Sequence, residues 1–161
     1  MKNISTLTHD LEQLWQKGSS PDPELLKVFC DNVSDAITSS FTEAVSKEKR
    51  TVLRMSSLGK PSRQLWYESR DSTEPEQLDY STRLKFLYGH MIEELLVLLV
   101  KMAGHSVEDQ QEEHDIDGVK GHQDARVDGV LVDFKSASGR SFSKFKNQTL
   151  TEDDPFGYVG Q

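Results

Sequence analysis

The chain has 161 residues and a formal net charge of −8, with 35% hydrophobic and 29% charged residues, which suits one solvated domain with a hydrophobic core. No run of eighteen apolar residues and no apolar signal segment occur, so we expect a cytoplasmic protein with no membrane contact. The single cysteine, Cys30, excludes an internal disulfide and any cluster built from cysteines.

The charge is distributed unevenly along the chain. Residues 105–119 are almost purely acidic, whereas residues 47–70 hold seven basic and two acidic side chains. Residues 120–147 hold six basic and three acidic side chains. A negative net charge argues against a nucleic-acid partner, but the two basic segments are typical of one.

Two helices are predicted in the N-terminal part. Apolar residues recur at helical spacing within residues 5–17, which predicts a short amphipathic helix. Asp22 has the features of an N-cap, and Pro23 suits the first position of a second helix that extends to about Ser46. We therefore expect residues 1–50 to form an N-terminal helical region.

Two further helices are expected before the strands. A turn at residues 59–61 leads into a short helix, and residues 71–79 form a polar loop. The strongest helical pattern covers residues 81–103, where one apolar stripe broadens until the helix is apolar nearly all round. Gly104 is expected to end this helix, which must be buried on more than one side.

The part after residue 104 reads as strands followed by an irregular basic segment. Strand-forming residues cover 105–113, 120–127 and 130–136, and the chain is basic and irregular from Ser138 onward. A long buried helix followed by a short, mainly antiparallel meander predicts an α/β fold.

The dipeptide Asp128-Gly129 lies between two strand-like runs and predicts a hairpin with a type I′ turn. If these two residues form the loop, Asp124 faces Asp133 across the strands. Lys135 then lies on the same face, opposite His122. The register therefore predicts two facing carboxylates with a lysine beside them.

Facing carboxylates destabilise a sheet unless something neutralises them. Oxygen ligands of this kind suit Mg²⁺ or Mn²⁺, and a neighbouring lysine could hold or deprotonate a water near a phosphate. This is the outline of metal-assisted phosphodiester hydrolysis. The alternative from the residues alone is a structural hairpin, with Asp124 and Asp133 exposed on its strands and Asp128 a plain turn residue.

The pattern Gly-His-x-Asp, with Asp-x-Lys nine positions after its aspartate, resembles the PD-(D/E)XK nuclease superfamily in its RecB-like and phage-type exonuclease branch. The resemblance implies a restriction-endonuclease-like core over residues 51–161. It assigns the metal, Mg²⁺ with Mn²⁺ as a substitute, to Asp124, Asp133 and the Phe134 carbonyl. It assigns the positioning or activation of the hydrolytic water to Lys135.

The segment "YGHMIEELL" is similar to the family's helix motif Gly-x-x-x-Glu. This similarity implies a metal or catalytic role for Glu93, with Glu94 as the alternative register. His90 resembles a histidine that some relatives place near the metal. The alternatives are a solvated pair of glutamates and a capped or packed histidine.

Two basic segments resemble DNA-contacting parts of the family. "RMSSLGKPSRQLWYE" resembles a segment with Ser-x-Leu and Cys-Pro-Arg, but it has no cysteine, which implies that the iron–sulfur cluster of some relatives is absent. "SASGRSFSKFKNQTL" resembles the loop after the catalytic lysine in phage-type members. The residues implied to contact DNA are Arg54, Ser57, Lys60, Arg63, Lys144 and Lys146.

The resemblance covers residues 54–161. Relatives continue with a helix carrying Gln-x-x-x-Tyr and a further strand, and Gln161 resembles the first residue of that motif. We therefore expect the C-terminal part of the core to be missing from this chain.

Together these features predict a Mg²⁺-dependent deoxyribonuclease. The resemblance implies an exonuclease on double-stranded DNA ends in phage or bacterial recombination or repair, within a bacterial or phage-infected cell. It also implies a homo-oligomer or a recombination partner. The alternatives are a catalytically inactive DNA-end-binding or assembly module and a structure-specific endonuclease. A small-molecule metal hydrolase would not need the basic segment at residues 47–70.

Overall fold

The computed structural model describes residues 2–42, 53–70, 79–152 and 154. The chain forms two compact units. The first unit consists of Met1–Ser46, Gln77–Glu112 and Gln123–Lys135. The second unit consists of Lys47–Glu76, Glu113–His122 and Ser136–Gln161. None of the helices in the described ranges is long and apolar enough to cross a membrane.

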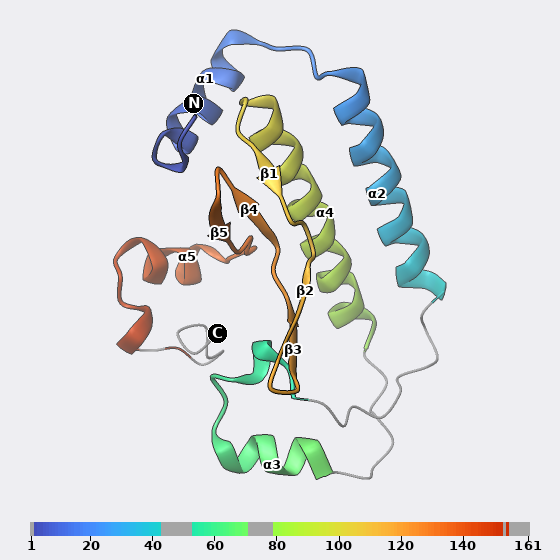
Figure 1. The fold of residues 1–161 in the computed structure, drawn as a ribbon, viewed down its shortest axis with the longest axis vertical. Helices are drawn as coiled ribbons and strands as arrows, with labels where there is room; N and C mark the ends of the chain where they lie inside the picture. Colours follow the sequence, from blue (N-terminus) through green and yellow to red (C-terminus); the bar gives the residue numbers. More distant parts are fainter. Residues whose placement is uncertain (1, 43–52, 71–78, 153, 155–161) are drawn as a thin grey trace. The chain divides into compact units, whose positions relative to one another are not determined.

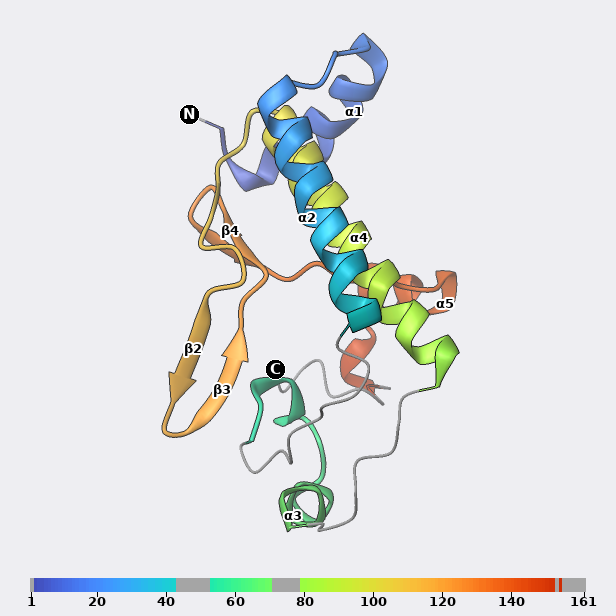
Figure 2. The same cartoon turned by 90° about the vertical axis from the view of Figure 1, so that its right-hand side faces the viewer.

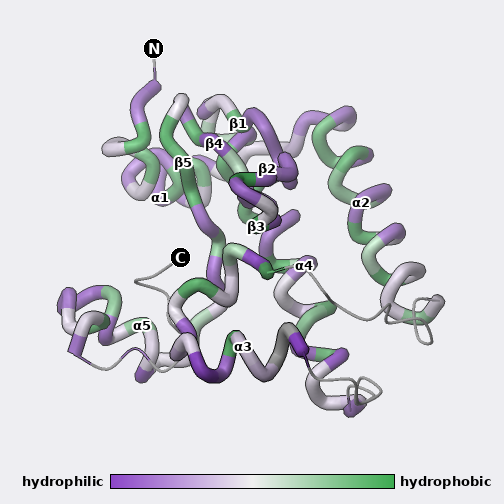
Figure 3. The backbone as a smooth tube through the Cα atoms, turned by 60° about the horizontal axis from the view of Figure 1, so that its bottom comes forward, coloured by the Kyte–Doolittle hydropathy of each residue, from purple (hydrophilic) through white to green (hydrophobic). Residues whose placement is uncertain are grey.

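The described residues of the first unit form three α-helices and one 3₁₀ turn. These are η1 (Ile4–Thr6), α1 (Leu7–Lys17), α2 (Pro23–Thr42) and α4 (Tyr80–Met102). Helices α2 and α4 run side by side in both views of the ribbon (Figures 1 and 2). Hydrophobic and hydrophilic residues alternate along the turns of α2, as expected for an amphipathic helix (Figure 3).

Aspartates cap the starts of the two longest helices of this unit. The Asp22 carboxylate accepts hydrogen bonds from the backbone N–H groups of Glu24 and Leu25, so the predicted N-cap of α2 is confirmed. The predicted end of this helix near Ser46 lies outside the described residues. Asp79 caps α4 by accepting from the Thr82 N–H at 2.7 Å, while the rest of the predicted loop lies outside the described residues.

Helix α4 supplies much of the buried core of the first unit. Val97, Leu98 and Val100, all in its second half, are buried. The helix ends at Met102 with Ala103 as its C-cap, and the predicted stop residue Gly104 follows with a φ of 85°, a left-handed conformation that glycine adopts without a steric penalty.

The same unit holds a three-stranded antiparallel sheet. Its strands are β1 (Val107–Glu108), β4 (Ala125–Val127) and β5 (Val130–Val132), in the order β1-β4-β5. Ala125 and Val127 are completely buried on β4. Asp128 and Gly129 have φ of 51° and 79°, so the predicted type I′ turn is confirmed.

The second unit contains a separate two-stranded hairpin. Its strands are β2 (Glu113–Ile116) and β3 (Val119–His122), joined by Asp117 and Gly118 with positive φ (Figure 2). The prediction of one continuous meander was therefore wrong. Positive φ at Asp109 and Gln111 ends the predicted strand 105–113 early. The Asp117-Gly118 dipeptide carries the same turn signal as Asp128-Gly129 and lies between the predicted strands 105–113 and 120–127, but the prediction did not assign a hairpin to it.

The second unit also holds helices outside the hairpin. These are η2 (Met55–Ser57), α3 (Ser62–Arg70), α5 (Gly139–Lys146) and η3 (Leu150–Glu152). The prediction of an irregular chain from Ser138 onward was wrong. The Ser138 hydroxyl caps α5 by accepting from the Ser141 N–H at 3.3 Å, and a serine at this position is a local signal for a helix start.

Gly121 on β3 is required by close packing within this unit. An added Cβ at Gly121 would lie 2.8 Å from side-chain atoms of Met55 in η2. The fold as a whole is a mixed α/β arrangement with small antiparallel sheets, as predicted at that level. The predicted boundary at residue 50 stays a prediction.

Candidate functional site

Asp124 and Asp133 lie at the open end of the β4–β5 hairpin. The ladder pairs Val127 with Val130 and Ala125 with Val132, which is the predicted register. Asp124 and Asp133 are the next residues on the two strands. The Asp124 carboxylate reaches across the hairpin, where its Oδ2 accepts from the Phe134 N–H at 2.5 Å. Asp124 is therefore held against the strand that carries the Asp-x-Lys pattern.

Lys135 contacts the second aspartate directly. Its Nζ lies 2.7 Å from Asp133 Oδ1, as expected for residues two apart on one strand face. The prediction that Lys135 lies opposite His122 was wrong. His122 pairs instead with Glu113 across β2–β3, because Gln123 and Asp124 interrupt the strand between β3 and β4.

Glu93 on α4 is tied to the same region through Gln111. Its Oε1 accepts from Gln111 Nε2 at 2.5 Å. The backbone N–H of Gln111 donates to the Asp124 carbonyl at 3.2 Å. Glu94, the alternative in sequence, has its Oε2 bound to Asn32 Nδ2 of α2 at 2.8 Å. Glu93 therefore faces the strand with Asp124, and Glu94 faces α2.

The half-buried carboxyl of Glu93 is in an unfavourable environment for ionisation. Burial raises the pKa of Glu93, and the charges of Asp124 and Glu94 raise it further. The hydrogen bond from Gln111 and the nearby His90 oppose this rise in pKa but do not cancel it. Glu93 and Asp124 therefore interact as like charges.

Asp124 is in a similar environment. Burial raises the pKa of the Asp124 carboxyl, and the negative charge of Asp133 adds to the rise. The Phe134 N–H, Lys135 and His90 act in the opposite direction on this pKa. The Asp124 carboxylate is thus coupled to a second acid across the hairpin and to a third on α4.

His90 lies one helical turn before Glu93 on α4 and is exposed. It is close enough to act electrostatically on both Glu93 and Asp124. The predicted role of His90 near a metal stays a prediction.

The donor chemistry of this cluster fits a hard divalent cation. Asp124, Asp133, Glu93 and the Phe134 carbonyl all offer oxygen, and a cation would relieve the repulsion among the carboxylates. Within the described ranges, however, no group of three or more His, Cys, Asp or Glu side chains is arranged to hold a metal ion. Each carboxylate is instead engaged through one oxygen by a protein donor. Binding one ion would require these side chains to rotate toward it.

The residues predicted to contact DNA all belong to the second unit. Arg54 precedes η2, and its backbone bridges to Lys120 of β3. Arg63 is exposed on α3. Ser57, the last residue of η2, and Lys60, which lies between η2 and α3, are half-buried. Lys144 and Lys146 lie in the last turn of α5, where Lys144 is half-buried and Lys146 is exposed.

Gln111, which binds both Glu93 and the Asp124 backbone, is a residue of the carboxylate cluster that the sequence did not reveal. It lies in the acidic segment before the hairpins, and no motif distinguishes it from its neighbour Gln110. Its position follows from a left-handed backbone at φ 54°, which directs the side chain toward Glu93. Only the tertiary contact identifies it.

A second polar cluster joins α1 to the β4–β5 turn within the first unit. The buried side chain of His105 places Nδ1 2.6 Å from Asp128 Oδ2 and Nε2 3.1 Å from Asp10 Oδ2. Hydrogen bonds to Thr6 and Lys2 help lower the pKa of Asp10 to about 2. Asp128, predicted as a plain turn residue, therefore also anchors a buried histidine.

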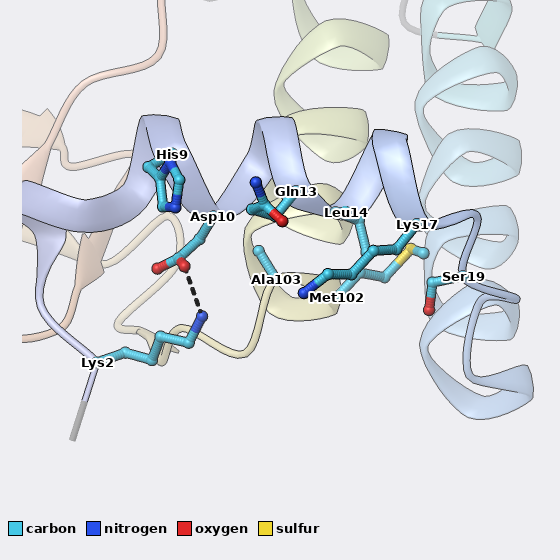
Figure 4. A pocket seen from close by; sticks show the side chains of 9 residues that line it. All are labelled: Lys2, His9, Asp10, Gln13, Leu14, Lys17, Ser19, Met102 and Ala103. Atoms are coloured by element: carbon cyan, nitrogen blue, oxygen red, sulfur yellow. Dashed lines mark ion pairs between the residues drawn. The ribbon is translucent and has the colours of Figure 1, made fainter.

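A polar hollow of about 380 Å³ lies beside α1 in the first unit (Figure 4). Lys2 and Asp10 form an ion pair of 3.0 Å at its edge, and Met102 and Ala103 are among the other lining residues. Its lining residues include none of those predicted to bind metal or DNA. The carboxylate cluster is therefore a separate feature of the same unit.

Comparison of the chain with protein-family models, with curated proteins and with solved structures found no match.

Proposed function

We propose that this protein is a metal-dependent deoxyribonuclease of the PD-(D/E)XK type with a restriction-endonuclease-like core. The observation that supports it best is the hairpin end, where Asp124 reaches across toward the strand that carries Asp133 and Lys135. The electrostatic coupling of Asp124 to Glu93 adds a third acid from a different element. Three acids and one lysine from a hairpin and a helix supply oxygen ligands and a cationic donor, which metal-assisted phosphodiester hydrolysis can use.

The chain's own residues have distinct roles in this proposal. Asp124, Asp133 and the Phe134 carbonyl hold the ion, with Glu93 as a direct or water-mediated ligand. A bound Mg²⁺ or Mn²⁺ supplies charge stabilisation at the phosphoryl oxygen and a lower pKa for the attacking water. Lys135, held at 2.7 Å from Asp133, donates to that water or to a phosphate oxygen and so orients it.

Duplex DNA ends are the proposed substrate, and the basic residues of the second unit are the proposed phosphate contacts. Arg54 and Arg63 are exposed near the start of that unit, and Lys146 is exposed at its α5 helix. A structure-specific endonuclease with the same cluster is the alternative. The two activities differ in whether circular DNA is cleaved.

The test is cleavage of linear and circular DNA in Mg²⁺ and in EDTA. Asp124→Ala, Asp133→Ala and Lys135→Ala should each reduce cleavage by at least about 100-fold, because each removes a ligand or a proton-handling group. Glu108→Gln, at an exposed position on strand β1 of the same sheet, is the matched control and should cleave as the wild type does.

Wild-type cleavage by all three alanine variants would contradict the proposal. Binding of DNA ends without any metal-dependent cleavage would instead identify an inactive DNA-binding module. Isothermal titration with Mn²⁺ gives a second readout, since the proposal requires binding to the wild type and loss of binding in Asp124→Ala.

A further inference from the structure

Helix α3 carries two large aromatic side chains at its surface. Trp66 is 51% exposed and Tyr67 is 54% exposed. Their rings lie 5.0 Å apart at 88°, an edge-to-face arrangement. Two adjacent aromatic rings of this size at a helix surface form a platform with accessible ring area.

An arginine lies against each of the two rings. The Arg63 guanidinium is 5.9 Å from the centroid of Tyr67, and the Arg70 guanidinium is 4.9 Å from the centroid of Trp66. Both pairs are four residues apart, so each arginine lies one helical turn from its ring. Four residues, Arg63, Trp66, Tyr67 and Arg70, therefore form an aromatic–arginine face on α3.

The charge of this segment selects an anionic partner. Residues 53–70 contain Arg54, Lys60, Arg63 and Arg70 but only one acid, Glu68, in a chain whose net charge is −8. An exposed aromatic pair surrounded by cations suits a polymer that offers flat rings and negative charges together. Nucleic acid with accessible bases has both.

We propose that the aromatic–arginine face of α3 binds single-stranded DNA, with an unpaired base stacked on Trp66 or Tyr67 and phosphates at Arg63 and Arg70. In duplex DNA the base faces are covered by their neighbours, so the rings would engage a frayed or unpaired end. This inference rests on the proposed action on DNA and specifies the form of DNA that the second unit binds. It does not depend on metal or on cleavage.

Tryptophan fluorescence provides a direct test, because the chain has two tryptophans, Trp15 and Trp66. In Trp15→Phe, Trp66 is the sole fluorescent tryptophan. Titration with an oligothymidylate of about ten nucleotides in EDTA should quench its emission, and the quenching should weaken as salt is added. In the matched variant Trp66→Phe, only Trp15 of α1 reports, and its emission should not change.

Affinity measurements extend the test to the arginines. Trp66→Ala should weaken binding of the oligothymidylate by about tenfold or more, whereas Trp66→Phe should retain most of it. Arg70→Gln should lower the slope of log affinity against log salt by up to about one. A blunt, fully paired duplex should show a smaller effect of Trp66→Ala than the single strand does.

The outcomes separate this inference from the proposed nuclease activity. Unquenched Trp66 emission, or equal affinity of wild type and Trp66→Ala for the oligothymidylate, would overturn the stacking inference even if cleavage is found. Quenching of Trp66 fluorescence in EDTA, together with no DNA cleavage in Mg²⁺, would support the stacking inference and contradict the nuclease proposal. Circular dichroism of each variant confirms that α3 substitutions leave the helical content unchanged.

Discussion

Glu93 and Asp124 are acids in an environment that disfavours their ionised forms. The pKa of each carboxyl is raised, chiefly by burial. The charges of Asp124 and Glu94 also raise the pKa of Glu93, and the charge of Asp133 also raises the pKa of Asp124. A group that binds a proton more tightly when folded destabilises the fold once it is ionised. These side chains thus impose a stability cost at neutral pH that a bound cation would relieve.

Glu93→Gln should therefore raise the Tm at pH 8 in EDTA, since the amide oxygen can still accept from Gln111 while the charge is removed. The difference should disappear below pH 4, where Glu93 is protonated in both the folded and the unfolded chain, given a reference value of 4.5. Differential scanning calorimetry from about pH 3 to about pH 8 measures this effect. Glu108→Gln is the control for loss of one surface charge.

Added Mn²⁺ should reverse this order. The wild type should gain Tm with Mn²⁺, and Glu93→Gln should gain less, because it has lost one proposed ligand. An unchanged Tm in EDTA together with an equal response to Mn²⁺ would contradict both the electrostatic and the ligand role of Glu93.

At the scale of elements, α1 is attached to the sheet of its unit through a buried histidine. The His105 ring lies between Asp10 of α1 and Asp128 of the β4–β5 turn. Each ring nitrogen lies within hydrogen-bond distance of one carboxylate oxygen, so the buried ring joins the two elements. The turn that brings Asp124 and Asp133 together is thereby linked to the N-terminal helix.

Acid should weaken this attachment. Hydrogen bonds from Thr6 and Lys2, with a smaller effect of His105, lower the pKa of Asp10 from 3.8 to about 2. The stability that Asp10 contributes is therefore complete above about pH 4 and is lost as the pH falls through 2. Wild type should lose stability over this interval more steeply than Asp10→Asn. Amide hydrogen exchange of α1 measures the local effect at neutral pH, where Asp10→Asn should exchange faster than the wild type.

His9→Ala is the matched control for this experiment, because His9 is exposed on the same helix turn. Equal hydrogen exchange of α1 in the wild type and Asp10→Asn, with parallel acid unfolding curves, would show that the Asp10 carboxylate does not stabilise the attachment of α1.

At the scale of the whole molecule, DNA binding has to overcome a net charge of −8. Long-range electrostatics oppose the approach of DNA, so binding must depend on local clusters of basic residues. The exposed Arg54 and Lys146 belong to two such clusters in the sequence. We expect DNA affinity to be strongly salt-dependent in spite of the acidic composition.

Arg54→Ala combined with Lys146→Ala should weaken duplex binding uniformly across sequences. The slope of log affinity against log salt should fall by about two, because each substitution leaves one phosphate without its neutralising cation. Fluorescence anisotropy at several salt concentrations measures the slope. Lys27→Ala, which removes an exposed lysine from α2, should leave the slope unchanged. An equal slope in the wild type, Lys27→Ala and the double variant would show that Arg54 and Lys146 do not contact DNA.

The sequence alone was sufficient for features that depend on neighbouring residues. The Asp128-Gly129 turn and the ladder from Val127–Val130 to Ala125–Val132, directly beyond which Asp124 and Asp133 lie, could be predicted because a two-residue I′ turn sets its own register. The helices starting at Asp22 and Asp79 could be located because capping and apolar periodicity are local. The Ser138 cap of α5 is equally local, so the start of that helix was within reach of the same reasoning.

Only the tertiary structure decided which groups from distant segments meet. Glu93 and Glu94 are adjacent on one helix, and their roles separate because Gln111 binds one and Asn32 binds the other. His122 joined the β2–β3 hairpin rather than facing Lys135, since the strand breaks at Gln123 and Asp124. Contacts of this kind depend on which faces are buried together, and burial results from the packing of the whole unit rather than from spacing along the chain.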